Sequence, residues 1–286
     1  MRHKLIATLQ NIDLKGVRRF SLALPKLLMP KTDTVSLHEL KTKDGIYLLI
    51  DPAQDKGLER SLFENGHYEL GTQQLLNQFL KKGSVFLDIG ANIGLFTIQA
   101  AKIVGKSGKV IAFEANPKTQ KILSHNLDLN HVEQVVTYGV ALSDENGETT
   151  IYENWNVNRG GASLISQDNQ EGISIQMVKL DALFETNEQV DLVKLDVEGW
   201  EGNVLRGGMN LFKAQNPIFI IEVSKVRENE KGIQPEEIVE IVKSIGDYQF
   251  FKQKSGKART GKLVEILSNE DLPNHDNIIC IPNRKI

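Results

Sequence analysis

The chain has 286 residues, of which 40% are hydrophobic and 25% are charged, and its formal net charge is −3. This size fits one globular domain, or one domain with an appendage, and the slight acidic excess argues against a general nucleic-acid binder. The single cysteine, Cys280, excludes an internal disulfide and a thiolate metal cluster. No stretch approaches the roughly 20 apolar residues that span a bilayer, and no secretory pattern opens the chain, so a cytoplasmic protein is predicted.

Residues 1–31 form a basic segment with seven Lys and Arg residues against one acid, Asp13. Its apolar residues recur at roughly helical spacing, which predicts an amphipathic helix. Two interpretations stay open. Such a helix can make a peripheral contact with an anionic membrane surface, or it can pack against its own domain.

A hairpin and a second helix are predicted next. The stretch LHELKTKDGIYLLIDP has two β-prone runs around Lys43-Asp44-Gly45, which is a turn signal. Residues 68–81, YELGTQQLLNQFLK, have the pattern of an amphipathic helix that ends at Gly83. We assign residues 1–80 to an N-terminal extension built from these elements.

From residue 85 onward, short apolar strands alternate with helical patterns, which is typical of a parallel sheet with crossover helices. The domain predicted for residues 81–286 is therefore of the α/β class. The expected strands are 85–89, 109–114, 135–141, 191–196, 217–223, 248–253 and 276–282. The expected helices are 94–104, 117–129, 200–206 and 235–245.

Residues 143–190 interrupt this alternation with a polar loop between the strand-like runs ETTIYE and ISIQMVKL. An insertion at the rim of such a sheet predicts a substrate lid. Within it, the stretch WNVNRGGASLIS offers Arg159 and Ser163 as substrate-binding donors beside a glycine hinge. A surface loop without that role is the alternative.

The stretch VFLDIGANIGLF, residues 85–96, indicates a cofactor turn after a buried strand. A dinucleotide fingerprint needs glycines at the first, third and sixth positions, but after Gly90 these positions hold Asn92 and Leu95. A Walker phosphate loop is excluded because no Gly-Lys-Ser/Thr ending follows. The remaining candidate is the Asp-x-Gly-x-x-x-Gly turn that binds S-adenosylmethionine (SAM).

The chemistry of SAM favours this turn over a phosphate site, because SAM carries an ammonium group and a sulfonium. Asp88 would repel pyrophosphate but can hold the ammonium group, directly or through water. Glu114, 26 positions further on at the end of the next strand, can accept two hydrogen bonds from ribose hydroxyls. Dinucleotide enzymes hold ribose in the same way, so Glu114 alone does not discriminate. A plain strand-to-helix junction is the alternative for the turn itself.

The third strand, VVTYGVAL, is expected to deliver the adenine wall near Val140 and Ala141, although both are also ordinary strand residues. The cofactor residues predicted in this part of the chain are Asp88, Gly90, Ala91, Asn92, Gly94, Glu114, Ala115 and Ala141.

Three acids, Asp196, Glu198 and Glu222, follow the fourth and fifth strands at the edge where ligands of open α/β sheets bind. They could hold the SAM ammonium group, deprotonate a substrate hydroxyl or bind a divalent cation. Structural alternatives exist, because Glu198 could cap the helix near Trp200 and Lys194 could form an ion pair with Asp196. No metal site is predicted from histidines, because the six are scattered. No Gly-x-Ser-x-Gly hydrolase elbow occurs.

In sequence, the segments LDIGANIGLFT, VIAFEANP, GVALSDENGE, KLDVEGWEGNVLRGG and IIEV resemble the FkbM-type SAM-dependent methyltransferases, in that order. The resemblance covers about residues 40–225. It implies a class I methyltransferase fold, Rossmann-like, with a seven-stranded, mostly parallel sheet, and SAM as methyl donor. Members of this family typically methylate hydroxyl oxygens of sugars, glycolipids or secondary metabolites.

Carried over to this chain, the resemblance implies roles for single residues. It places Asp196 at the reacting centre, and GHYELGTQQLL would bring Tyr68 and Glu69 to the mouth of the cofactor site. The residues implied at the methionine end are Asp88, Gly90, Asn92 and Gly94, with Glu114 at the ribose.

The predicted reaction is an in-line displacement at the SAM methyl by a substrate hydroxyl, which needs a general base. The expected base is Asp196, followed by Glu222 and then Glu198. The expected partner is a small-molecule, sugar or glycolipid acceptor and no nucleic acid. Two other classes stay open: a SAM-binding scaffold without catalysis, and a nicotinamide-dependent oxidoreductase.

Overall fold

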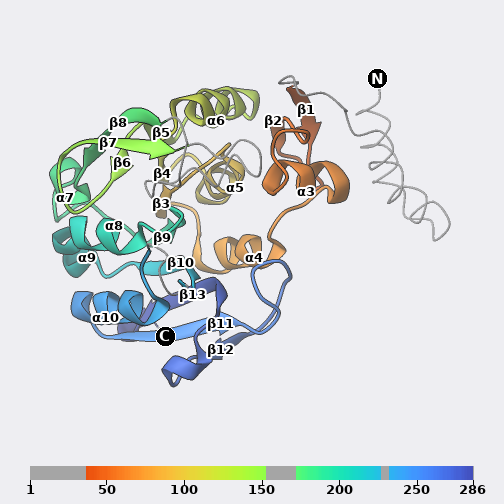
Figure 1. Cartoon of the computed structure of the whole chain (residues 1–286). Helices are drawn as coiled ribbons and strands as arrows, with labels where there is room; N and C mark the ends of the chain where they lie inside the picture. Colours follow the sequence, from red (N-terminus) through yellow and green to blue (C-terminus); the bar gives the residue numbers. More distant parts are fainter. Residues whose placement is uncertain (1–36, 153–171, 227–231, 286) are drawn as a thin grey trace.

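The computed structural model describes residues 37–152, 172–226 and 232–285, and its centre is one sheet of eight strands (Figure 1). From edge to edge the strands are β12 (Leu263–Glu265), β11 (Tyr248–Gln253), β13 (His275–Pro282), β10 (Ile218–Ser224), β9 (Leu192–Leu195), β3 (Val85–Ile89), β4 (Lys109–Phe113) and β5 (Val135–Tyr138). Strands β10, β9, β3, β4 and β5 run parallel, whereas β13 is antiparallel to both β10 and β11.

The order of the strands places a switch point between β3 and β9. The chain winds from β3 outward through β4 to β5, and later returns to the other side of β3 with β9 and β10. Connections therefore leave β3 and β9 in opposite directions, which opens a crevice at their carboxyl ends. This is the seven-stranded class I arrangement that the sequence implied, with β12 added at one edge.

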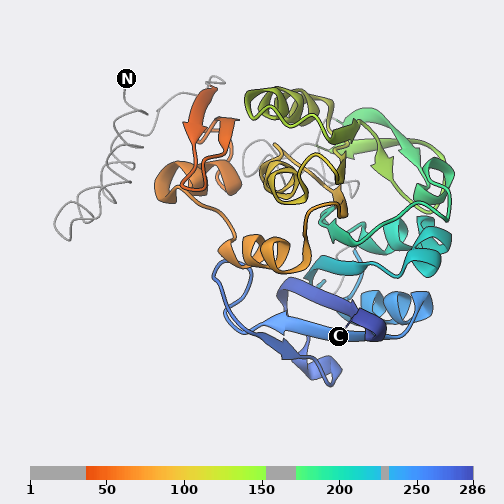
Figure 2. The ribbon, with the colours of Figure 1, turned by 180° about the vertical axis from the view of Figure 1, so that it is seen from behind.

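Helices cover both faces of the sheet because side chains of a strand alternate between faces. Phe86 packs in the core shared with α4, α5 and α6, whereas the next residue, Leu87, packs in the core shared with α7 to α10. Figure 2 shows both layers from behind. The helices are α3 (Leu58–Asn65), α4 (Leu70–Phe79), α5 (Leu95–Val104), α6 (Pro117–Leu129), α7 (Leu180–Leu183), α8 (Glu201–Gly207), α9 (Met209–Gln215) and α10 (Pro235–Ile245). Two 3-10 turns lie at Asn269–Asp271 and Asn283–Lys285.

Local signals fix the starts of two crossover helices. The side chain of Asn116 accepts hydrogen bonds from backbone amides of the first turn of α6, and Pro117 opens that helix. Helix α10 begins with Pro235 and a capping box in which the side chains of Gln234 and Glu237 bond reciprocally to the backbone. Both helices match their predicted ranges.

Two smaller sheets flank the central one. The predicted hairpin is present as β1 (His38–Lys41) and β2 (Tyr47–Ile50). Its residues Leu48 and Ile50 belong to the same core cluster as Phe86, so the described part of the predicted extension shares its core with the central sheet. A three-stranded sheet contains β6 (Ala141–Leu142), β8 (Gly172–Val178) and β7 (Gly147–Tyr152).

Several predicted boundaries are wrong. The strand expected at 135–141 ends at Tyr138, and Ala141 belongs to the three-stranded sheet. The helix expected at 68–81 is shorter, because the chain turns extended at Leu80, before Gly83. The prediction also missed α3, α7, α9 and β12, whereas the strand-like runs ETTIYE and ISIQMVKL within 143–190 are present as β7 and β8. Residues 153–171, the centre of the predicted lid, are outside the described residues, as are residues 1–36.

No helix within the described ranges is long and apolar enough to cross a bilayer. The basic segment 1–31 lies outside those ranges, so its contact with a membrane surface stays a prediction.

Candidate active site

The candidate site lies where the carboxyl ends of β3, β4 and β9 meet. In register, Ile89 of β3 lies between Phe113 of β4 and Leu195 of β9. Each strand is followed at this edge by a residue that the sequence singled out. These residues are Gly90, Glu114 and Asp196.

The glycine turn after β3 contacts the loop after β9 directly. The amides of Gly90 and Ala91 both donate to the carbonyl oxygen of Phe113, at 3.0 and 2.9 Å. Gly90 has a φ of 85°, and a Cβ at this position would lie 1.8 Å from the carbonyl oxygen of Asp196. Glycine is therefore required here by the neighbouring loop, an internal reason that the sequence analysis, which assigned it to the cofactor, did not give.

Glu114 holds this turn through both of its carboxylate oxygens. One oxygen accepts the amide of Asn92 and the other accepts the amide of Asn116, each at 2.9 Å. Burial raises the pKa of Glu114 to about 7, although these two hydrogen bonds oppose the shift. Asn92 has a φ of 51°, and Gly94, with a φ of 91°, caps α5. Contact of Glu114 with a ribose stays a prediction.

Buried acceptor oxygens of Asp88 and Asn92 show whether the turn fits SAM. One oxygen of Asp88 accepts the hydroxyl of Thr97, whereas its Oδ1 and the Oδ1 of Asn92 are buried and have no hydrogen-bond partner among the described residues. Burial raises the pKa of Asp88 despite the nearby Lys194 ammonium. Unsatisfied buried acceptors are costly, and SAM offers donors in its ammonium group and its ribose hydroxyls. The residues of the turn therefore fit SAM.

The ion pair between Lys194 and Asp196, which the sequence left open, is present. Lys194 Nζ lies 2.9 Å from Asp196 Oδ2, with the lysine side chain 4% exposed and the aspartate side chain 26% exposed. Burial acts to raise the pKa of Asp196, but the ammonium groups of Lys194 and Lys257 outweigh it and lower that pKa. Asp196 is thus an ionised carboxylate that solvent or a ligand can still reach.

Glu222 lies beside Asp196 and shares a lysine that the sequence analysis missed. Lys257 Nζ lies 2.7 Å from a Glu222 oxygen and 3.1 Å from a Glu69 oxygen. Burial and the charge of Asp196 raise the pKa of Glu222 to about 8, and a hydrogen bond from Glu222 helps to keep Asp196 ionised. His275 Nε2 lies 3.5 Å from the other Glu222 oxygen. The signal for Lys257 was its position after a strand that ends at the same edge as the acids.

Two acids lie near the start of α8: Glu198, which was predicted as the third candidate base or as a helix cap, and Glu201, which the prediction missed. The N-cap residue of α8 is Trp200, whose side chain makes no capping hydrogen bond. Instead Glu201, which is buried, accepts the amides of Val197 and Gly199 at 3.1 and 3.2 Å and thereby holds the loop. Glu198 is exposed, with a left-handed φ of 53°. The N-cap position of α8 is therefore occupied by Trp200 and not by Glu198.

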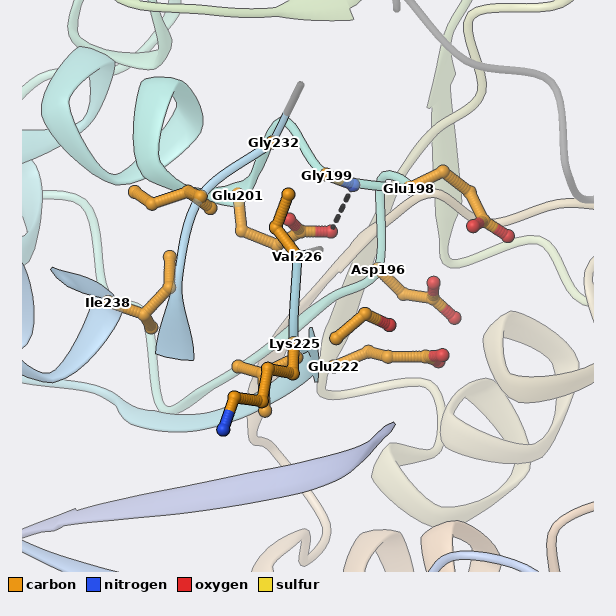
Figure 3. A pocket seen from close by; sticks show the side chains of 12 residues that line it. Asp196, Glu198, Gly199, Glu201, Glu222, Lys225, Val226, Gly232 and Ile238 are labelled. Carbon is orange, nitrogen blue, oxygen red and sulfur yellow. Dashed lines mark hydrogen bonds between the residues drawn. The ribbon is translucent and has the colours of Figure 1, made fainter. Parts of the chain in front are cut away.

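A cavity of about 170 Å³ opens between the loop after β9 and the segment after β10. Figure 3 shows the carboxylates of Asp196 and Glu222 pointing in the same direction, while the ammonium group of Lys225 points away from them. Glu198 and Glu201 also line this cavity. Its described wall is consequently rich in carboxylates.

Of the remaining predicted site residues, some lie within the described ranges and others do not. Ala115 packs against the small core of the three-stranded sheet to which Ala141 belongs. Arg159 and Ser163 lie outside the described residues. No cluster of metal-binding side chains occurs within the three described ranges.

Comparison with known proteins identifies the family. Residues 88–250 match the family model of the methyltransferase FkbM domain, so the chain belongs to the FkbM methyltransferase family. The chain is 28% identical over 171 residues to the hexuronic acid methyltransferase AglP of Haloferax volcanii. That match covers 59% of this chain and 65% of the relative, so the chain spans less than two thirds of that relative's length.

Two further similarities are more distant or shorter. A tRNA (guanine(37)-N(1))-methyltransferase of Aedes aegypti is 43% identical over 60 residues, which are 21% of this chain and 10% of that protein. The crystal structure of an FkbM methyltransferase from Methylobacillus flagellatus has 12% identity and a TM-score of 0.44, and the similarity covers 98% of this chain and 57% of that one.

The family membership confirms the predicted family, the methyltransferase class and SAM as the cofactor. It does not decide which atom of the acceptor is methylated. The predicted exclusion of nucleic acid is not supported, because a tRNA methyltransferase is among the relatives.

Proposed function

We propose that this chain transfers the methyl group of SAM to a hydroxyl oxygen of a sugar or a related polyhydroxy acceptor. The observation that carries the proposal is the direct contact between the glycine turn and the loop that presents Asp196. Because the backbone of Gly90 touches the carbonyl of Asp196, the cofactor turn and a reachable carboxylate are held in fixed relation. The relative that methylates a hexuronic acid supports a sugar acceptor.

Each residue of the site has a definite part in this reaction. Bound SAM supplies an electrophilic methyl group and a neutral sulfide leaving group. Asp88 and Asn92 offer buried acceptors for the donors of SAM. Asp196 accepts the hydrogen bond of the acceptor hydroxyl and takes its proton, and the fixed orientation of the two loops aligns the reactants and excludes water.

Glu222 is the second candidate base. Its pKa of about 8 lies close to an ordinary working pH, which suits proton transfer, whereas Asp196 remains ionised at lower pH. Since a hydrogen bond joins the two carboxyl groups, they titrate as a pair. Glu198 ranks third, because it is exposed.

The charge of the cavity favours a neutral acceptor over an anionic one. Four carboxyl groups line its described wall. The lysine charges keep Asp196 ionised, whereas burial raises the pKa of Glu198 and Glu201 to about 7 and that of Glu222 to about 8. The single lysine there, Lys225, points away from Asp196 and Glu222. A uronic acid would meet like charge, so a neutral sugar should be methylated faster than the matching uronate.

The test is formation of S-adenosylhomocysteine from labelled SAM with a panel of neutral sugars, matching uronates and tRNA. Asp196→Asn should retain SAM affinity within a few-fold and lose about 10²-fold or more in turnover, the usual contribution of a general base. Glu240→Gln, at an exposed acid that does not line the cavity, serves as the control and should retain wild-type turnover. Near wild-type turnover of Asp196→Asn would show that Asp196 is not the base.

Three other results would change the proposed function. Tight SAM binding without turnover on any acceptor would favour a scaffold, and calorimetric binding of NAD without SAM would favour an oxidoreductase. Methylation of tRNA alone would replace the sugar acceptor by a nucleic acid.

A further inference from the structure

Lys257 reaches the candidate site from outside the part of the chain that matches the family model, which ends at residue 250. It lies in the loop after β11, whose strand is antiparallel to β13 and ends at the same edge as β10. Its ammonium group contacts two carboxylates that come from distant parts of the sequence, Glu222 at 2.7 Å and Glu69 at 3.1 Å.

The backbone around Lys257 is fixed on both sides. Its amide donates to an oxygen of Asp276 at 2.8 Å, and its carbonyl accepts the amide of Gly71, near the start of α4, at 2.9 Å. Gly256 has a φ of 69°, and a Cβ there would lie 2.6 Å from Asp276. The side chain of Lys257 is only 16% exposed. The position of its ammonium group is therefore set by the fold.

The charged groups around Lys257 depend on its ammonium group for compensation. Besides Glu69 and Glu222, the groups that face the cluster are Asp196, Lys194, Glu198, His275 and Tyr68. Two ammonium groups thus serve the three carboxylates of Glu69, Asp196 and Glu222. Loss of one ammonium group would leave buried negative charge without compensation.

We propose that Lys257 is a positioning residue of the methyl-transfer site, which holds Glu222 beside Asp196 and ties α4 to the sheet edge through Glu69. This inference rests on the proposed function, because it assigns to Asp196 and Glu222 their place in that reaction.

The ionisation of Glu222 gives the inference a measurable consequence. The Lys257 ammonium lowers the pKa of Glu222, whereas Glu69 raises it. Removal of Lys257 should therefore move the titration of Glu222 to higher pH, and removal of the Glu69 charge should move it to lower pH.

The experiment compares the affinities of SAM and S-adenosylhomocysteine for the full chain by calorimetry across pH 6–10. Both ligands carry the same titrating amino group, but only SAM has a sulfonium charge, so the ratio of their Kd values reports the charge of the site. In the wild type the preference for SAM should rise with a midpoint near pH 8, as Glu222 ionises.

Lys257→Met should raise this midpoint by about one pH unit or more, the usual effect of losing an opposite charge at this distance. Lys257→Arg should restore the wild-type midpoint, and Lys254→Met, an exposed lysine of the same loop, should leave it unchanged. If Lys257→Met does not fold, Glu69→Gln provides the test, because loss of the Glu69 charge should lower the pH midpoint of the preference for SAM.

An unchanged midpoint in folded Lys257→Met, or an unchanged or raised one in Glu69→Gln, would overturn the role of Lys257 while leaving SAM binding and the proposed function intact. Failure of the wild-type chain to bind SAM would overturn the proposed function and this inference with it.

Discussion

Two groups of carboxylates lie at the same edge of the sheet and are held in different ways. In the glycine turn, Glu114 accepts two backbone amides and Asp88 accepts a hydroxyl. In the loop after β9 and at the end of β10, Asp196 and Glu222 contact the ammonium groups of Lys194 and Lys257.

The difference appears in their ionisation. The pKa of Glu114 rises to about 7 through burial even with two amide donors, whereas the charges of the lysines lower the pKa of Asp196. Backbone amides fix the position of a carboxylate but compensate little of its charge. An ammonium group fixes the position of the carboxylate and also compensates its charge. The turn is thus an acceptor surface suited to a cationic cofactor. Of the two acids paired with lysines, Asp196 is suited to remain ionised for proton transfer, whereas burial and the charge of Asp196 raise the pKa of Glu222 to about 8.

Among the variants considered, Lys194→Met should cause the largest loss in the free energy of unfolding. Removal of one partner of a buried ion pair leaves the Asp196 carboxylate uncompensated, which should cost about 3 to 5 kcal/mol in the free energy of unfolding. Denaturant unfolding would measure this, and the double variant Lys194→Met/Asp196→Asn should be less destabilised than the sum of its parts. Additive losses would mean that the pair is not coupled.

Gly90→Ala would break the contact between the two groups. A Cβ would lie 1.8 Å from the carbonyl oxygen of Asp196, so overpacking and the left-handed φ together should cost about 3 kcal/mol. The matched control is Gly45→Ala, whose φ of 73° is similar but whose Cβ would meet nothing within 4 Å. Equal losses in the two variants would show that the turn and the loop do not press on each other.

The sequence was sufficient to predict the strands and helices whose period is regular. The predicted ranges of β3, β11, α6 and α10 agree with the structure, because apolar periodicity and caps are local signals. The strand expected to run to Ala141 stops at Tyr138 since the next residues join another sheet, a tertiary choice with no local mark.

The candidate site shows the same limit. Asp88, Glu114 and Asp196 could be predicted because strand ends of a parallel sheet converge at one edge. Lys257 carried a weaker signal, because it lies four residues beyond the end of β11, and Glu201 carried none. The roles of both depend on which loop folds back over that edge. The internal reason for glycine at position 90 could not be predicted, because the chain segment it must accommodate lies more than a hundred residues away in the sequence.

Glu114→Gln tests the acid that is held by backbone amides, through the pH dependence of the free energy of unfolding. The folded protein holds the proton of Glu114 more tightly than the unfolded chain, in which the pKa is 4.5. Its contribution to stability is therefore complete below pH 4.5 and declines as the pH rises toward 7. Relative to Glu114→Gln, the wild type should lose about 1 to 3 kcal/mol of unfolding free energy over this range. Parallel stability curves from denaturant titrations at pH 5, 6 and 7 would contradict the raised pKa.

Lys243→Met should have the smallest effect, and it isolates burial as the cause of the others. Lys243 Nζ lies 2.8 Å from Glu240, a distance close to that of the Lys194–Asp196 pair, but its side chain is 53% exposed and that of Glu240 is 70% exposed. Solvent screens such a pair, so the loss in unfolding free energy should be about 0.5 kcal/mol or less. If Lys243→Met cost as much as Lys194→Met under the same conditions, distance rather than burial would set the strength of these ion pairs. Burial would then not explain why the acids paired with lysines differ from the acids that accept backbone amides.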